Sequence, residues 1–383
     1  MKNQGVGARS SLGYEDFTDR FRSKAQPAEA VDRFRWESDQ IALLQNFTSF
    51  TNGILGNGEN PGLHRWRVGE KDALGKLRTF FSTCPHRGLH AGEVILSPKD
   101  WQAVVREAAA RAVGEDVGPT DVTSRTVIPE GAYAVAVLVA KEPCVLAGLD
   151  VAEAVFREVD GSLRWLAKAK DGDRIVKGDV VAEVEGAARS ILTAERCALN
   201  FLQQLSGVAT KTSAFVDAIK GTSARILDTR KTTPGLRALE RHAVRCGGGV
   251  NHRTGLYDGI LIKENHLIFI SPTELEGVIK KARAAYPDLP LVVEADSVAL
   301  AERLLSQPVD RILLDNLSPE QVTEVVALRA KMGTKVDLEA SGGVTEQRAL
   351  ALAKAGVEWI SVGGITHSAQ AMDFSLDIQP KRI

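Results

Sequence analysis

The feature that most restricts the fold of this chain is the regular alternation of short apolar runs and helical segments after residue 220. Strands that alternate with helices indicate βα units and a parallel sheet. The expected strands cover residues 225–228, 259–263, 291–294, 311–315, 336–340 and 359–363, and the helices between them include 272–285, 297–306, 318–331 and 345–355. Six such units favour a closed or nearly closed α/β barrel. An open nucleotide-binding sheet is expected to carry a glycine fingerprint after its first strand, and none is present.

The segment before this region mixes helices and strands in a less regular order. Ser97 and Pro98 form a typical helix start, a capping side chain followed by proline at the first helical position, and Gly114 and Gly118 are expected to close that helix. Residues 132–140 and 163–169 are expected as strands, residues 172–184 as a turn-rich β segment, and residues 148–159 and 190–207 as helices.

Residues 1–90 differ from the rest, because they are rich in Gly, Asn, Ser and Arg and show no steady periodicity. Loop-forming residues dominate the stretch 51–62. We expect a poorly ordered N-terminal extension, or sequence translated upstream of the true start, and assign it no function.

Composition excludes several classes of protein. The 48 basic and 49 acidic residues nearly cancel, whereas a general nucleic-acid binder usually carries a basic excess. The four cysteines are far apart and form no CxxC pair, which argues against a disulfide scaffold or a zinc ribbon. Cys84, His86 and His90 could be taken as a metal triplet, but nothing else supports it. No apolar stretch approaches the roughly 20 residues of a membrane span and no secretory signal is visible, so we expect a cytoplasmic protein with no membrane or nucleic-acid partner.

Charged or phosphate-binding groups follow nearly every expected barrel strand. In a β/α barrel the carboxyl ends of the strands converge on one mouth, where active sites lie. The strand-end groups are Asp228 with Arg230 and Lys231, then Lys263, Glu294, Asp315, Ser341-Gly342-Gly343 and Gly363-Gly364. One such residue is usually a solvated loop residue, but a nearly complete ring indicates a binding site.

The ring separates by charge. A cationic set comprises Arg230, Lys231, His252, Arg253 and Lys263, and such a concentration of positive charge indicates an anionic ligand. The two carboxylates, of Glu294 and Asp315, suit ribose hydroxyls or a Mg²⁺ ion that bridges a pyrophosphate. Gly342, Gly363 and Gly364 allow backbone N–H groups to approach a phosphate closely.

Three of these residues also have structural interpretations. Asp228 is as well suited to hold its loop by hydrogen bonds as to touch a substrate. His252 alone would be structural in most proteins, although its position beside Arg253 favours function. His367 follows the last glycine pair and suits either a helix cap or a phosphate contact. Arg196, early in the helix 190–207, opposes the helix macrodipole, which hints at another task.

Five long motifs carry a resemblance to a known family. They are residues 228–237, Asp-Thr-Arg-Lys-Thr-Thr-Pro-Gly-Leu-Arg; 246–253, Cys-Gly-Gly-Gly-Val-Asn-His-Arg; 262–266, Ile-Lys-Glu-Asn-His; 339–343, Glu-Ala-Ser-Gly-Gly; and 361–367, Ser-Val-Gly-Gly-Ile-Thr-His. Together and in this order they resemble the quinolinate phosphoribosyltransferases, from about residue 97 to 378. Two parts depart from the pattern: residues 1–90 match nothing in the family, and residues 115–123 only approximate its usual stretch.

The resemblance implies an N-terminal α/β sandwich domain followed by an incomplete α/β barrel of six or seven strands. We assign residues 91–205 to the sandwich, which the C-terminal segment can rejoin, and residues 206–383 to the barrel. It also implies a homodimer with a shared active site, in which each chain inserts its own Arg196 into the site of the other chain. By the same resemblance, quinolinate carboxylates are bound by Arg230, His252, Arg253 and Lys263, whereas phosphoribosyl pyrophosphate and Mg²⁺ are contacted by Lys231, Glu294, Asp315, Ser341, Gly342, Gly363 and His367.

The reaction implied is a type II phosphoribosyl transfer in de novo NAD biosynthesis. Quinolinate and phosphoribosyl pyrophosphate give nicotinate mononucleotide, pyrophosphate and CO₂, with Mg²⁺ as cofactor and Lys231, Glu294 and Asp315 as catalytic residues. Three alternatives stay open: the related protein encoded with molybdate transport systems, a barrel lyase that uses Lys231 or Lys263 as a Schiff base, and a non-catalytic binding protein.

Overall fold

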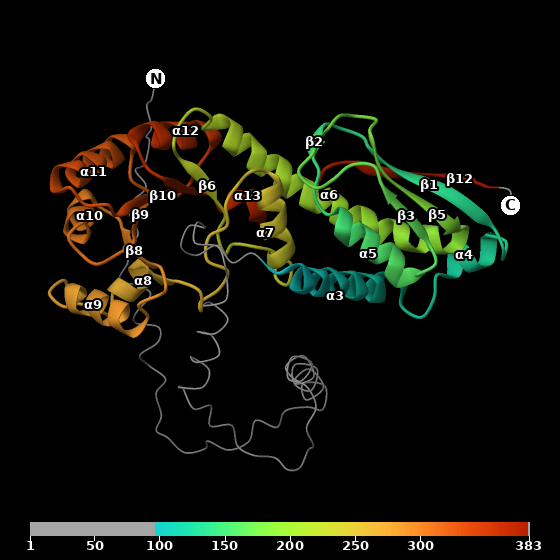
Figure 1. Cartoon of the computed structure of the whole chain (residues 1–383), viewed down its shortest axis with the longest axis horizontal. Helices are drawn as coiled ribbons and strands as arrows, with labels where there is room; N and C mark the ends of the chain where they lie inside the picture. The colour runs from blue at the N-terminus through green and yellow to red at the C-terminus, as the bar shows by residue number, and fades with distance from the viewer. Residues whose placement is uncertain (1–95, 382–383) are drawn as a thin grey trace, which may run out of the picture. The chain divides into compact units, whose positions relative to one another are not determined.

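The computed structural model describes residues 96–381, and the extension predicted over residues 1–90 lies outside the described residues. The described residues belong to one compact unit. Its first domain contains an antiparallel four-stranded sheet and its second a parallel six-stranded sheet (Figure 1). Within residues 96–381, no helix is long and apolar enough to cross a membrane.

The antiparallel sheet has the strand order β12-β1-β5-β3. Its strands are β1 (Tyr133–Ala140), β3 (Arg164–Ala167), β5 (Val180–Ala187) and β12 (Phe374–Pro380). Alternate residues of β1 are buried, as expected for a strand with one face on a core. Strand β12 comes from the end of the chain and pairs with β1 from Ala134↔Pro380 to Ala140↔Phe374, which closes the first domain.

Four helices accompany this sheet: α3 (Pro98–Val117), α4 (Val122–Val127), α5 (Leu149–Val159) and α6 (Ala188–Ala218). Ser97 caps α3 by accepting a hydrogen bond from the Asp100 N–H, with Pro98 at the first helical position. Buried side chains of β1, α5 and α6, such as Leu138, Phe156 and Leu202, share one apolar core. A short pair of strands, β2 (Cys144–Val145) and β4 (Arg174–Ile175), lies beside α6 (Figure 1).

Helix α6 is longer than predicted, because Gly207 does not end it. A Cβ at Gly207 would overlap the backbone of Gln370, so the glycine is required for the close approach of residues 370–371 rather than for a turn. Gly114 likewise lies inside α3, which ends at Gly118 with φ +53°. As a result, α6 crosses the boundary between residues 205 and 206 and continues into the barrel domain.

The second sheet has the order β6-β11-β10-β9-β8-β7, with every neighbouring pair parallel. Its strands are β6 (Arg225–Leu227), β7 (Ile260–Ile262), β8 (Leu291–Ala295), β9 (Arg311–Asp315), β10 (Asp337–Ser341) and β11 (Trp359–Ser361). Within the described chain β6 and β7 do not pair, and a bridge between Leu227 and Val250 lies beside β6 instead. This confirms the predicted architecture, an N-terminal sandwich followed by an incomplete barrel.

The helices of the second domain follow the βα alternation. They are α7 (Arg237–Cys246), α8 (Glu264–Leu267), α9 (Leu275–Ala285), α10 (Val298–Leu304), α11 (Pro319–Met332), α12 (Glu346–Ala355) and α13 (Gly364–His367). Several begin at side-chain caps, such as Ser318 of α11 and Thr345 of α12. Because all six strands run the same way, their carboxyl ends form one edge, and the loops after them carry the candidate site.

Candidate active site

The acidic strand-end residues lie on adjacent strands. Glu294 is in β8 and Asp315 ends β9, and Asp315 stands in register with Ser341 at the end of β10. Lys263 follows β7, and its Nζ lies 2.9 Å from Oε2 of Glu294. The Glu294 side chain is 5% exposed, whereas that of Lys263 is 48% exposed. A buried carboxylate is thus held under a cation that still reaches solvent.

The loop after β9 is shaped by Asn316, which has φ +58°. Its side-chain amide donates to Oδ2 of Asp315 at 2.7 Å, and its backbone N–H donates to the Ser341 carbonyl at 2.9 Å. A Cβ at Gly342 would overlap the Asn316 side chain, and Gly342 itself has φ +97°. Both the limited space and the backbone conformation therefore require glycine at position 342. The sequence had predicted this glycine only from its suitability for a phosphate contact.

Lys231, Gly363 and His367 are brought together after β6 and β11. A Cβ on Gly363 would lie 3.0 Å from Cδ of Lys231 and 3.3 Å from Nε2 of His367. The Thr366 hydroxyl donates to the Lys231 carbonyl at 2.7 Å, which ties the two loops together. A cation thus lies against the glycine pair at the start of α13.

Lys211 is a neighbour of this loop that the sequence did not suggest. Its Nζ donates to the Ser368 carbonyl at 2.7 Å and lies 4.0 Å from a Cβ built on Gly364. Lys211 comes from α6, beyond the residue at which that helix was expected to end. The sequence offered no motif around Lys211 that would have indicated a role at this loop.

Arg253 has a buried side-chain nitrogen that the described residues leave without a partner. Its Nη1 donates to the Gly259 carbonyl at 2.8 Å, but its buried Nε has no hydrogen-bond partner among the described residues. Burial lowers the pKa of Arg253, and the nearby Arg230 lowers it further, while Asp258 opposes both. A partly buried guanidinium group near the exposed guanidinium of Arg230 indicates that an anion completes the site.

His252 is held by the protein at both ring nitrogens. Nδ1 accepts a hydrogen bond from the Arg253 backbone N–H at 2.7 Å, and Nε2 lies 3.3 Å from Oε1 of Glu339. Glu339 is fully buried in β10 and also contacts Arg311 at 2.9 Å and the Ser361 hydroxyl. In this arrangement the ring faces the barrel interior, so its predicted contact with a substrate would require one of these bonds to be released.

Asp228 acts as the anchor of the same loop. Its fully buried carboxylate accepts hydrogen bonds from the His252 N–H at 2.6 Å and the Asn251 amide at 2.7 Å, with Arg241 at 3.7 Å. Burial raises the pKa of Asp228, and Arg241 and the hydrogen bonds counteract that effect. Of its two interpretations, the structure shows loop support.

A pocket of about 90 Å³ lies between the loop 250–253 and strands β7 to β9. His252, Arg253, Gly259 and Arg311 line it together with Trp359. Two predicted substrate-binding residues, His252 and Arg253, line this pocket, whereas the predicted carboxylates of Glu294 and Asp315 do not. Arg196 is exposed on α6 in the first domain, and no described contact joins it to the strand-end residues.

The donor set at the barrel mouth fits Mg²⁺. Glu294 and Asp315 offer carboxylate oxygens from neighbouring strands, and Mg²⁺ is usually held by one or two carboxylates together with substrate phosphates. Within residues 96–381 these two do not belong to a preformed group of three or more metal-binding side chains. Such a site would therefore depend on oxygens that the substrate supplies.

We expect the Glu339 network to make stability depend on acid pH. Burial alone would raise the pKa of Glu339, but His252, Arg311 and Ser361 outweigh it and lower the pKa to about 2. Because the folded pKa is below the ordinary 4.5, the contribution is present above pH 4.5 and is lost as the pH falls toward 2. Its full size is on the order of 3 kcal/mol.

Urea unfolding of the wild type and Glu339→Gln between pH 3 and 6 measures this contribution. The gap between the two proteins should be largest at pH 6 and should shrink as the pH falls. Glu183→Gln, which removes a carboxylate that is 33% exposed beside Lys168, should change stability by less than about 1 kcal/mol. A constant gap across this pH range for Glu339→Gln would contradict the assignment.

Comparisons with known proteins now add to this geometry. Residues 121–206 match the N-terminal domain model, and residues 208–377 the C-terminal domain model, of quinolinate phosphoribosyl transferase. Nicotinate-nucleotide pyrophosphorylase [carboxylating] from Mycobacterium leprae is 43% identical over 287 residues, which is 74% of this chain and 100% of that protein. The chain belongs to the quinolinate phosphoribosyltransferase family.

Other relatives and solved structures agree with this assignment. A probable nicotinate-nucleotide pyrophosphorylase [carboxylating] from Bacillus subtilis is 39% identical, over 69% of this chain and 90% of that protein. The crystal structure of NadC from Streptococcus pyogenes is 38% identical with a TM-score of 0.70, over 76% of this chain and all of that one. The nicotinate-nucleotide pyrophosphorylase structure from Francisella tularensis is 34% identical with a TM-score of 0.69, with the same coverage.

Proposed function

We propose that this quinolinate phosphoribosyltransferase family member converts quinolinate and phosphoribosyl pyrophosphate to nicotinate mononucleotide, pyrophosphate and CO₂, a step of de novo NAD biosynthesis. The observation that carries the proposal is Arg253, which lies near the guanidinium group of Arg230 and whose buried Nε has no hydrogen-bond partner among the described residues, so that a bound anion would complete the site. Quinolinate supplies two carboxylates, which guanidinium groups bind bidentately. The family assignment supports the same substrate.

The proposed mechanism is mainly electrostatic. Lys231, beside Gly363 and His367, lies where it would contact the 5′-phosphate or the departing pyrophosphate. Glu294 and Asp315 would hold the ribose hydroxyls and Mg²⁺, and the bound ion would neutralise charge on the pyrophosphate. The quinolinate nitrogen attacks the anomeric carbon as the bond to pyrophosphate breaks. The pyridinium nitrogen stabilises the electron pair left on the adjacent ring carbon when its carboxylate departs as CO₂, and that carbon then takes a proton from solvent.

A Schiff-base lyase is disfavoured by the environment of Lys263. Its ammonium group lies 2.9 Å from a buried carboxylate of Glu294. That carboxylate occupies the ammonium group, whereas a Schiff-base lysine must present its amine to a carbonyl. The carboxylates of Glu294 and Asp315, at the same barrel edge as the glycine-rich loops after β10 and β11, favour a catalytic protein over one that only binds its ligand.

We propose further that two copies complete each other's sites. Arg196 is exposed on the first domain of its own chain and has no described contact with the barrel mouth. Insertion into the site of a second copy would give this arginine an anionic partner, which the described residues of its own chain do not offer. We also propose that the enzyme acts in the cytoplasm, on small-molecule substrates alone.

The test is a Mg²⁺-dependent assay of the full chain with quinolinate and phosphoribosyl pyrophosphate, with nicotinate as a parallel substrate. Nicotinate mononucleotide and CO₂ should form from quinolinate, and no product should form from nicotinate. Absence of product from folded protein at saturating substrates would refute the proposed activity. Sedimentation of the wild type in the same buffer tests the proposed dimer separately.

A further inference from the structure

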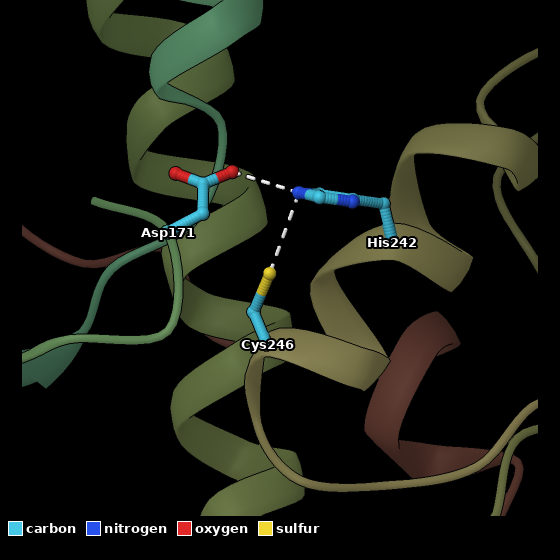
Figure 2. Close-up of side chains that lie close together, drawn as sticks. All are labelled: Asp171, His242 and Cys246. Carbon is cyan, nitrogen blue, oxygen red and sulfur yellow. Dashed lines mark hydrogen bonds and ion pairs between the residues drawn. The ribbon is translucent and has the colours of Figure 1, made fainter. Parts of the chain in front are cut away.

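A cluster of three metal-binding side chains lies outside the barrel mouth, where the first domain meets α7. Asp171 belongs to the loop between β3 and β4, whereas His242 and Cys246 are one turn apart on α7 (Figure 2). Nε2 of His242 lies 2.8 Å from Oδ2 of Asp171 and 3.4 Å from Sγ of Cys246. All three donor atoms lie within 4.8 Å of one another.

Both neighbours converge on the same ring nitrogen, as Figure 2 shows. In a nucleophilic triad the carboxylate orients one ring nitrogen, and the other nitrogen receives the proton of the nucleophile. Here Nδ1 instead faces Nη2 of Arg245 at 3.4 Å. The arrangement therefore excludes a Cys-His-Asp triad, and resembles donor atoms gathered around one central position.

The spacing is close to that of a tetrahedral zinc site. Zn–N and Zn–S bonds of about 2.0 and 2.3 Å place the two donors roughly 3.5 Å apart, and the Nε2–Sγ distance is 3.4 Å. The Nε2–Oδ2 distance of 2.8 Å is a hydrogen bond and would open by roughly 0.5 Å around an ion. Only small side-chain shifts are therefore needed for these two distances to match those of a zinc site.

Two of the donors are held in place by their surroundings. Asp171 accepts hydrogen bonds from the N–H groups of Gly148 and Leu149 at 2.9 and 3.1 Å, at the start of α5. The ring of Trp101 stacks on His242 with centroids 4.4 Å apart. Supporting contacts of this kind orient metal ligands in known sites. The side chains of Asp171 and His242 are 15% and 21% exposed, so an ion has access from solvent.

We propose that Asp171, His242 and Cys246 bind one Zn²⁺ per chain, which ties the loop before β4 to α7. The combination of thiolate, imidazole and carboxylate selects Zn²⁺ over Mg²⁺, which prefers oxygen ligands. Binding releases the Cys246 proton to solvent and moves the His242 ring proton to Nδ1. Arg245 then gives up its long contact with that nitrogen and keeps its 2.7 Å bond to Asn251.

The test uses the full chain, with Co²⁺ as a spectroscopic probe and Zn²⁺ for stoichiometry. Co²⁺ should give a thiolate charge-transfer band, Zn²⁺ should remove it, and excess Mg²⁺ should not. One Zn²⁺ per chain should survive dialysis, and Zn²⁺ should raise the Tm by roughly 5 °C. Cys246→Ser, and His242→Phe, which keeps an aromatic ring for Trp101, should each weaken binding by more than about 100-fold.

Cys84→Ser is the matched control, because Cys84 has His86 and His90 near it in the sequence and lies outside the described residues. This variant should retain the cobalt band and the zinc stoichiometry of the wild type. The proposal is overturned if the wild type shows no thiolate band, or if the band is lost in Cys84→Ser and kept in Cys246→Ser. Neither readout depends on enzymatic activity, so the result is independent of the proposed reaction.

Discussion

Replacement of Arg253 by alanine should abolish most of the affinity for quinolinate while leaving the fold intact. Truncation of one partner of a buried charge pair costs about 2–5 kcal/mol, so the apparent affinity should fall roughly 30- to several-thousand-fold. The effect should appear in the KM for quinolinate, with the KM for phosphoribosyl pyrophosphate nearly unchanged. The physical reason is that Arg253 is partly buried near a second guanidinium group, and its Nε has no partner among residues 96–381.

Two companion variants distinguish this role from a general effect of charge. Arg253→Lys keeps the charge but loses the planar fork, so it should restore only a small part of the affinity. Arg303→Ala removes an exposed arginine that bonds the Pro272 carbonyl on the outside of the barrel, and should leave both KM values unchanged. An Arg253→Ala enzyme with the wild-type KM for quinolinate would remove this residue from the substrate site.

Replacement of Glu294 by glutamine should lower kcat by about 10²–10³-fold, the usual cost of removing one preorganised electrostatic group. Glu294 is nearly buried at the end of β8 and is paired with Lys263. In the proposed mechanism, this change removes the negative charge of one Mg²⁺ ligand and of a group that would stabilise positive charge at the anomeric carbon. Steady-state rates measured across a range of Mg²⁺ concentrations should show both the lower kcat and a weaker response to Mg²⁺.

Asp315→Asn on the adjacent strand provides a comparison within the site. If the two carboxylates share one ion, the double variant should lose less than the product of the two single effects. Glu324→Gln, an exposed residue of α11, is the neutral control. Wild-type kcat and Mg²⁺ dependence in Glu294→Gln would mean that this carboxylate only holds Lys263 in place.

The barrel and the candidate residues were largely predictable because their signals are local. Apolar runs that alternate with helical segments specify parallel βα units, and the groups after each run must then share one edge. Lys263, Glu294 and Asp315 were found in this way. Glu294 and Asp315 do lie on adjacent strands, and Lys263 directly follows the next strand, β7. The predicted end of α6 was wrong because the helix was expected to stop at Gly207, whereas this glycine allows close contact with a segment over 160 residues later.

The pairing of side chains inside the barrel could not be predicted. From the sequence, Glu339 was named only as part of a family motif. In the structure it contacts His252 and Arg311, and the three residues come from separate segments of the chain. Lys211 contacts Ser368, in the segment after β11, from a helix that belongs mainly to the first domain. No periodicity or motif relates these positions, because their proximity depends on how whole elements pack.

The sequence by itself therefore determined the family, the order of the two domains, and the chemistry gathered at the barrel mouth. Only the tertiary structure decided that the His252 ring contacts Glu339, and that Asp171 meets His242 and Cys246 across 71 residues or more. It also decided that the Arg253 Nε finds no partner within the described part of the chain. The physical reason is that backbone periodicity and turn chemistry act over a few residues. Contacts between side chains are set instead by the packing of elements that are distant in the chain.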